Sequence, residues 1–212
     1  MAGNEWLTGT EARSEYDEPH APVEATDDVM GSSLHFKTVD VGHPVPFSAP
    51  EWAVHYDDPS FFYEGGRVPK TLRSGYWWIE IGPPWDTLHD NEALRHELTR
   101  HVLGIWDFIK NRDPNLKEKA RNLALDWVGQ VPGKRETRRL LGRYVMTEND
   151  LVQRTVFPDE VAYGGWYVDL HTLGGLLAQT SEPLNARKLD PTSEYGVKTY
   201  AVSYTHLRAH ET

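Results

Sequence analysis

Residues 127–171 read WVGQVPGKRETRRLLGRYVMTENDLVQRTVFPDEVAYGGWYVDLH and contain the densest group of basic residues in the chain. Four of these follow directly after a Pro-Gly turn signal: Lys134, Arg135, Arg138 and Arg139. The residue types at 139–147 tolerate a pleated backbone, so we expect Arg138 and Arg139 to lie where a strand begins. Their guanidinium groups would then point toward whatever lies beyond the end of that strand.

Two strands are predicted upstream of this segment. Residues 33–39 alternate apolar and polar side chains, which is typical of a half-buried strand. In residues 75–81, large apolar side chains occupy both sets of alternating positions. This second run is therefore predicted to be a central strand that is buried on both faces.

Two helices are predicted to follow the strands. The first begins near Asp90 or Asn91, ends before Asp113, and has apolar residues at three- and four-residue steps: Leu94, Leu98, Val102, Ile105 and Ile109. Asp113-Pro114 is typical of the start of a second helix, with an apolar stripe formed by Leu116, Ala120, Leu123 and Ala124. The two helices are expected to pair as a hairpin. The predicted fold class is α+β, with a mixed or antiparallel sheet.

Composition limits the possible partners and cofactors. A formal net charge of −10, from 32 acidic and 22 basic residues, argues against nucleic acid or an anionic membrane as a partner. The chain contains no cysteine, so it supplies neither a disulfide nor a thiolate ligand for an iron–sulfur centre. No apolar run approaches the ~20 residues of a membrane helix. The first thirty residues lack a secretion signal, which favours a cytoplasmic location.

The cationic segment also carries a resemblance. Four runs are similar to a segment of the bacterial FAD-dependent oxidoreductase family, whose members are often labelled xanthan lyase: GYWWIEIG at 75–82, HVLGIWDFIKN at 101–111, ALDWVGQVPGKRETRRLLG at 124–142 and VAYGGWYVDLH at 161–171. The resemblance covers roughly residues 3–200. It implies an FAD cofactor, a small-molecule organic substrate, and hydride transfer between the two.

The family's dinucleotide-binding signature is not visible in this sequence. The resemblance implies a strand, a G-x-G-x-x-G turn and a helix that holds the pyrophosphate, and a second stretch that contacts the cofactor. We therefore expect residues 1–201 to be the substrate-side part of a two-domain flavoprotein, with Met1 an internal methionine, and to be inactive alone. If Met1 is an internal methionine, the lack of a secretion signal in this sequence does not indicate the compartment. Residues 202–212 depart from the family pattern, resemble translated adapter sequence, and are expected to be a non-native tail.

Two apparent motifs are not interpreted as sites. The sequence HELTRH at 96–101 resembles the zinc motif H-E-x-x-H, but its second histidine lies five residues after the first. At 100° per residue the two side chains would be about 140° apart around a helix, so no metal site is predicted. The sequence GQVPGKR at 129–135 resembles a P-loop. It has one residue too few between the glycines and arginine where serine or threonine is required.

Candidate catalytic residues come from the two ends of the cationic segment. Arg138 can stabilise negative charge on the flavin or the substrate through a forked guanidinium. Asp169 and His171 are two residues apart and would share one face of an extended strand. The carboxylate would then orient the imidazole for proton transfer near neutral pH.

Other residues are candidates for substrate and cofactor contacts. Arg135, Glu80 and Trp166 are the candidates for substrate binding, and Gly164 and Gly165 could allow close approach of the backbone to the flat flavin ring. A structural reading stays open for each residue: an ion pair for Arg135 or Glu80, and a turn for the glycines.

The predicted function is a flavin-dependent oxidation of an organic substrate, with a polyol or sugar-like molecule suggested by the aromatic and acidic composition. Two alternatives stay open. One is a carbohydrate-binding module with Trp77, Trp78, Trp85 and Trp166 as stacking platforms. The other is a glycan-active hydrolase or lyase. A hydrolase would use a carboxylate pair such as Glu80 and Asp169, which must lie ~5–10 Å apart. The sequence does not indicate an oligomeric state.

Overall fold

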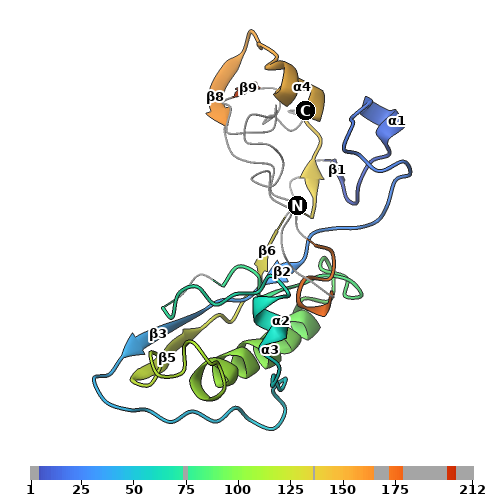
Figure 1. The fold of residues 1–212 in the computed structure, drawn as a ribbon. Helices are drawn as coiled ribbons and strands as arrows, with labels where there is room; N and C mark the ends of the chain where they lie inside the picture. Colours follow the sequence, from blue (N-terminus) through green and yellow to red (C-terminus); the bar gives the residue numbers. More distant parts are fainter. Residues whose placement is uncertain (1–4, 74–75, 136, 165–171, 179–199, 204–212) are drawn as a thin grey trace. The chain divides into compact units, whose positions relative to one another are not determined.

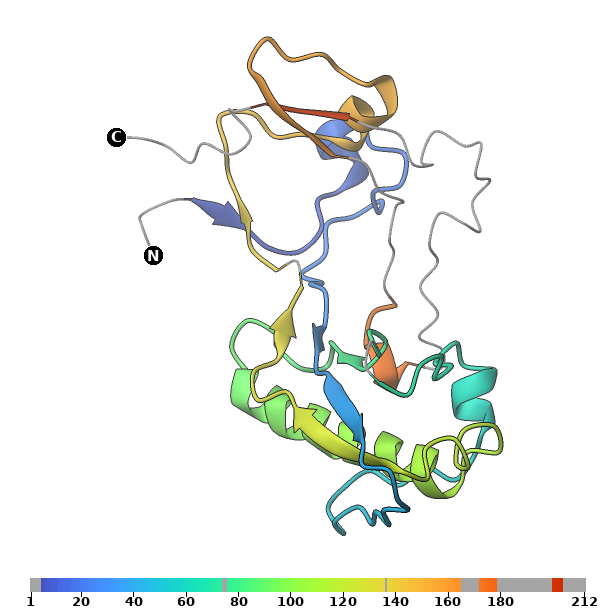
Figure 2. The same ribbon diagram turned by 90° about the vertical axis from the view of Figure 1, so that its left-hand side faces the viewer.

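A computed structural model describes residues 5–73, 76–135, 137–164, 172–178 and 200–203 (Figures 1 and 2). The chain divides into two compact units. Unit 1 comprises residues 1–29, 136–170 and 183–212, and unit 2 comprises residues 30–135 and 171–182. Within the described ranges, no helix combines the length and the apolar character needed to span a membrane.

Unit 2 contains the longest helix and two small antiparallel sheets. One sheet pairs β3 with β5, and the other has the strand order β4-β2-β6. Its elements are β2 (Ser32–Ser33), β3 (Phe36–Asp40), α2 (Ser60–Tyr63), β4 (Glu80–Ile81), α3 (Asn91–Asn111), β5 (Leu123–Val128), β6 (Gly133–Lys134) and the 3-10 helix η1 (Gly175–Leu177).

Unit 1 is built from short elements joined by polar contacts. Antiparallel pairs form between β1 and β7 and between β8 and β9. Thr147 and Asp150 form a reciprocal capping box that starts α4. Its elements are β1 (Trp6–Leu7), α1 (Arg13–Tyr16), β7 (Arg139–Leu140), α4 (Glu148–Gln153), β8 (Glu160–Gly164) and β9 (Tyr200–Ser203).

The segment expected to be a non-native tail begins inside a described strand. Val202 pairs with Ala162 and Ser203 pairs with Glu160 in the β8–β9 ladder. The rest of that segment, 204–212, lies outside the described residues.

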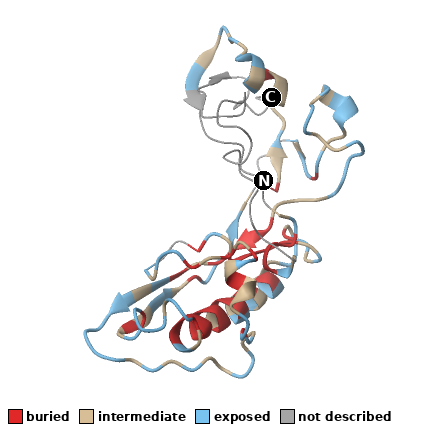
Figure 3. Cartoon of the chain, in the orientation of Figure 1, coloured by how far each residue is buried: buried red, intermediate tan, exposed pale blue. Residues whose placement is uncertain are grey.

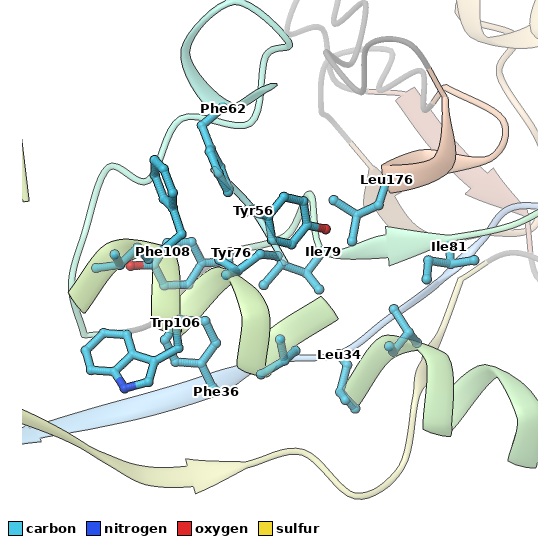
Figure 4. Close-up of a cluster of buried hydrophobic side chains, with 14 of the residues drawn as sticks. Leu34, Phe36, Tyr56, Phe62, Tyr76, Ile79, Ile81, Trp106, Phe108 and Leu176 are labelled. Atoms are coloured by element: carbon cyan, nitrogen blue, oxygen red, sulfur yellow. The ribbon is translucent and has the colours of Figure 1, made fainter. Parts of the chain in front are cut away.

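The core of unit 2 forms along α3. The helix begins at Asn91 and ends at Asn111, as the sequence predicts. All five apolar positions of the predicted stripe are fully buried. Buried residues recur on one side of the first half of this helix, whereas residues 104–110 in its second half are all buried (Figure 3). Aromatic rings from the surrounding segments complete the core, including Phe62 stacked on Phe108 at 4.2 Å and Phe36 stacked on Tyr76 at 4.7 Å (Figure 4).

The predicted central strand at 75–81 is wrong for most of its length. Only Glu80–Ile81 is a strand, and the amide of Ile79 donates to the carbonyl of Tyr76 in a turn. A strand would place Tyr76 and Ile79 on opposite faces, whereas the turn lets both enter the core, where they are 1% and 0% exposed. Trp77 is consequently left 63% exposed.

The predicted second helix does not form, so there is no helical hairpin. Residues 114–122 are turns, and Leu123 already belongs to β5, which pairs with β3. The carboxylate of Asp113 accepts from the amides of Asn115 and Leu116, as a cap would, but the helix is not continued. Cross-strand pairing with β3 takes Leu123 and Ala124, two of the four apolar residues that the pattern assigned to a helix, whereas Leu116 and Ala120 lie in the turns. The α+β class with antiparallel sheets is nevertheless confirmed.

The other strand predictions hold in part. The strand expected at 33–39 is divided into β2 and β3, which belong to different sheets. A strand does begin at Arg139, as predicted, but β7 has only two residues. Arg138 immediately precedes it.

Lys110 fixes the turns that replace the second helix. Its side chain is only 8% exposed, and its Nζ donates to the carbonyl oxygens of Ala120, Arg121 and Leu123 at 2.9, 3.0 and 2.9 Å. A buried ammonium that satisfies three carbonyls links the end of α3 to the start of β5. The lysine replaces the hydrogen bonds that a helix would have given those carbonyls.

We expect Lys110→Met to lower the free energy of unfolding by about 2–4 kcal/mol, because it removes three hydrogen bonds that a largely buried ammonium donates to carbonyl oxygens. Urea denaturation followed by circular dichroism would measure this loss. Lys119→Met, at an exposed lysine of the same turns, is the matched control and should change stability by less than about 0.5 kcal/mol. Equal effects of the two substitutions would show that the three carbonyl contacts contribute nothing.

His101 couples the stability of α3 to pH. Its Nδ1 lies 2.5 Å from the Tyr56 hydroxyl, and its Nε2 lies 3.3 Å from a Glu97 carboxylate oxygen. Burial lowers the pKa of His101 to about 4, although the Glu97 carboxylate acts in the opposite direction. The unfolded chain, with an ordinary histidine pKa, therefore binds a proton at higher pH than the folded chain does.

The free energy of unfolding should consequently fall as the pH drops below the ordinary histidine value. We expect His101 to account for a loss of about 2 kcal/mol between about pH 7.5 and about pH 5. Chemical denaturation at the two pH values would measure it, with His101→Gln as the non-titrating reference. A pH dependence that is the same in wild type and His101→Gln would contradict the assignment.

Candidate functional site

The three-stranded sheet of unit 2 brings two of the predicted substrate residues together. Ser33 on the central strand β2 lies opposite Glu80 on β4 and opposite Gly133 on β6. Residues opposite each other share a face, and Arg135 lies two residues beyond Gly133. The register therefore directs Ser33, Glu80 and Arg135 to the same side of the sheet.

Glu80 and Arg135 form a largely buried ion pair. Arg135 Nε lies 2.8 Å from Glu80 Oε2 and donates to Ser33 Oγ at 3.3 Å. The side chains of Arg135 and Glu80 are 19% and 5% exposed. Removing one member of such a pair leaves a buried charge without its counter-ion, so each side chain fixes the other.

Two glycines allow the backbone to enclose Glu80. A Cβ at Gly175, which has φ +54°, would lie 2.0 Å from the Glu80 carbonyl oxygen. A Cβ at Gly31 would lie 2.9 Å from Glu80 Oε1. Only glycine permits these approaches, and together they restrict the carboxylate to the position from which it meets Arg135.

Aromatic and imidazole rings lie beside the ion pair. The Arg135 guanidinium carbon is 5.7 Å from the centre of the Trp77 ring, and the His35 ring meets Trp77 edge-on at 4.3 Å. Burial, and secondarily the charge of Arg135, lowers the pKa of His35. His35 is therefore neutral at neutral pH. The cluster of Ser33, Glu80, Arg135, Trp77 and His35 is named the Glu80–Arg135 site below.

The other arginines of the cationic segment lie in unit 1. Arg139 donates to Glu11 Oε1 at 2.5 Å and to the Gly9 carbonyl at 2.6 Å, so it serves an internal ion pair. The Arg138 guanidinium carbon lies 5.0 Å from the centre of the Trp6 ring. Its Nε is shielded from solvent and has no hydrogen-bond partner among the described residues. The segment that looks like one cationic cluster in the sequence thus contributes to two units.

The remaining candidates fall at or beyond the edge of the described chain. Gly164 is the last residue of β8. Gly165, Trp166, Asp169 and His171 lie outside the described residues. The predicted flavin contact at Gly165 and substrate contact at Trp166 stay predictions. The predicted proton transfer by His171, oriented by Asp169, also stays a prediction.

A comparison with known protein families matches residues 1–212 to the family described as FAD dependent oxidoreductase. The chain belongs to the FAD-dependent oxidoreductase family. No curated protein and no solved structure matches it. Members of this family are flavoproteins, and their cofactor is FAD.

The described residues of this FAD-dependent oxidoreductase do not fit the pyrophosphate of FAD. Such a group binds at a glycine-rich turn between a strand and a helix N-terminus. Among the described elements α3 is the one helix of more than six residues, and acidic side chains, Asp86, Asp90 and Glu92, surround its start. These carboxylates would repel a diphosphate. No catalytic step through the flavin is derived from the described residues.

A metal-binding site is likewise not seen among the described residues. No three His, Asp or Glu side chains gather there into a cluster that could hold an ion. The two histidines of the zinc-like sequence have separate roles. His101 is buried against Tyr56, and His96 Nε2 lies 3.3 Å from Arg95 Nη2.

The sequence names Arg135 and Glu80 as candidates, but it gives no signal for Ser33 and His35 beyond that of ordinary strand residues. Trp77 is expected on a buried strand face in the main interpretation and as a stacking platform in the binding-module alternative. The departure of Tyr76–Ile79 from a strand exposes the indole, and alternation of residue types alone does not reveal that departure.

We expect a double-mutant cycle of Glu80→Gln and Arg135→Gln to give a coupling energy of about 1–3 kcal/mol, because the ion pair is largely shielded from water. Urea denaturation of the four proteins would measure it. The exposed Glu92–Arg95 pair on α3, with Oε2 and Nη2 2.9 Å apart, is the matched control and should give less than about 1 kcal/mol. Additive effects at Glu80 and Arg135 would contradict the pairing.

Proposed function

We propose that this chain supplies the substrate side of a flavin-dependent oxidoreductase that acts on a polyol or sugar-like substrate. The observation that carries the proposal is the Glu80–Arg135 site, a shielded ion pair beside an exposed indole. The absence of a pyrophosphate cradle among the described residues further supports the proposal that the FAD diphosphate binds elsewhere in the enzyme.

The chemistry of the Glu80–Arg135 site suits a hydroxyl-bearing ligand. A guanidinium donates to hydroxyl oxygens, a carboxylate accepts from hydroxyl groups, and an indole face packs against the C–H groups of a sugar ring. Because Arg135 and Glu80 neutralise each other, the site favours an uncharged polar ligand over an anion.

Proton transfer is assigned to residues at the C-terminal end of the cationic segment 127–171. We propose that His171, oriented by Asp169, exchanges the proton of the substrate hydroxyl. Arg138 stabilises the negative charge that develops on the substrate or on the flavin. Support for Arg138 is its shielded Nε, which has no hydrogen-bond partner in the described part of the chain. Trp166 and the backbone at Gly164 and Gly165 complete the proposed contacts to substrate and flavin.

FAD, when bound, supplies the acceptor for the hydride that leaves the substrate. The proposed roles of this chain's own residues are to bind the substrate and to move its proton. The chain alone is therefore expected to lack turnover.

The test uses the FAD-containing enzyme under anaerobic conditions, with D-sorbitol and D-glucose as probes in stopped-flow reduction of the flavin. We expect His171→Ala to slow reduction by ~10²–10⁴-fold with unchanged flavin content, as for loss of a general acid–base group. Arg138→Lys should slow it nearly as much as Arg138→Ala, because lysine keeps the charge but loses the forked geometry.

Arg139→Gln is the matched control, since Arg139 is engaged by Glu11 and should affect stability but not the rate of flavin reduction. If His171→Ala and Arg138→Lys both reduce flavin at the wild-type rate, the assignment is wrong. Glu80 is then the next residue to substitute.

A carbohydrate-binding module is the second candidate, and the exposure of Trp77 favours it. The platform expected from the sequence is nevertheless not reproduced, since Trp78 and Trp85 pack against the core. A glycan-active hydrolase or lyase has less support, because Glu80 is engaged by Arg135 and Asp169 lies outside the described residues. Retained flavin reduction by a sugar would separate the oxidoreductase from both alternatives.

A further inference from the structure

One face of the β3–β5 ribbon is covered and the other is open. Phe36 and Val128 are paired in register and point to the covered face, where Phe36 meets Trp106 of α3 at 5.7 Å (Figures 2 and 4). The next pair, Lys37 and Trp127, must point to the opposite face, because successive side chains alternate. His35 is two residues before Lys37 and shares that open face.

Two indoles are exposed on or beside this open face. Trp127 is 50% exposed, and Trp77, which meets the His35 ring at 4.3 Å, is 63% exposed. Gly129 follows Trp127 by two residues, and its amide donates to the His35 carbonyl at 2.8 Å. No cross-strand side chain therefore stands opposite His35, and Trp77 takes that place. We name Trp77, His35 and Trp127 the indole platform.

A cluster of polar side chains lies against Trp77, one of the two indoles of the platform. Arg135 lies against Trp77, and the Glu80 carboxylate and Ser33 hydroxyl fix Arg135 from beneath. Exposing two indoles costs free energy, since each is among the largest apolar groups that a protein can bury. The rigid cluster beneath Trp77 prevents the ring from folding back onto the core, so the exposure is built in.

We propose that the indole platform binds the ring faces of an oligosaccharide, with Arg135 donating to its hydroxyl groups. Indole faces stack on the C–H side of pyranose rings, while the donors at the edge recognise hydroxyls. Glu80 compensates the guanidinium of Arg135, and Lys37, the cross-strand neighbour of Trp127, adds a second hydrogen-bond donor for hydroxyl groups on the same face. The inference deepens the proposed function, on which its role as substrate contact rests, by specifying a ring saccharide of more than one unit rather than a linear polyol.

Isothermal titration calorimetry of the full chain with cellohexaose tests the platform without turnover. We expect binding, and we expect Trp77→Ala and Trp127→Ala each to weaken it by at least about tenfold. Trp52→Ala is the matched control, because Trp52 is 54% exposed but belongs to a different loop of unit 2, and its affinity should equal that of wild type. Unchanged urea midpoints would show that the variants are folded.

Two results would overturn the platform: no heat with cellohexaose in the wild type, or equal affinity in Trp77→Ala, Trp127→Ala and Trp52→Ala. Dimers that dissociate in Trp77→Ala and Trp127→Ala, with no saccharide binding, would assign the face to a second copy of the chain and also overturn it. Cellohexaose binding without flavin reduction by sugars would instead leave the platform standing and refute the proposed oxidation.

Discussion

Burial of the apolar side of α3 is the constraint on which unit 2 depends. Phe36 from β3, Phe62 from α2 and Tyr76 from the turn before β4 all reach this helix or its aromatic neighbours. Segments far apart in sequence are thereby brought to one core. The short strands could not remain associated alone, because two-residue ladders contribute few hydrogen bonds.

Polar groups inside this core decide the path of the chain between its elements. Lys110 gathers three carbonyls and so converts an expected helix into turns that lead directly to β5. His101 is held neutral beside Tyr56, which links the packing of α3 to pH. Breaking either contact removes hydrogen bonds from a largely buried side chain.

The Glu80–Arg135 site is a consequence of the same core. Tyr76 and Ile79 enter the core together, and the turn that permits this leaves Trp77 in solvent directly above Arg135. Gly31 and Gly175 then enclose the carboxylate that holds the guanidinium. The site and the fold are therefore coupled, because the turn that buries Tyr76 and Ile79 is also the feature that exposes Trp77.

The sequence by itself determined the family, the cofactor, the α+β class and the whole of α3, because amphipathic periodicity over 21 residues is a local property. It also named Arg135 and Glu80 separately as candidate substrate contacts, each with an ion pair as the alternative. Their pairing, the loss of the second helix and the exposure of Trp77 were decided only by tertiary structure. Each depends on a partner distant in the chain: Glu80 for Arg135, the β3 strand for Leu123, and Phe36 for Tyr76. Local propensity cannot encode such partners, since the free energy arises only when the distant segments meet.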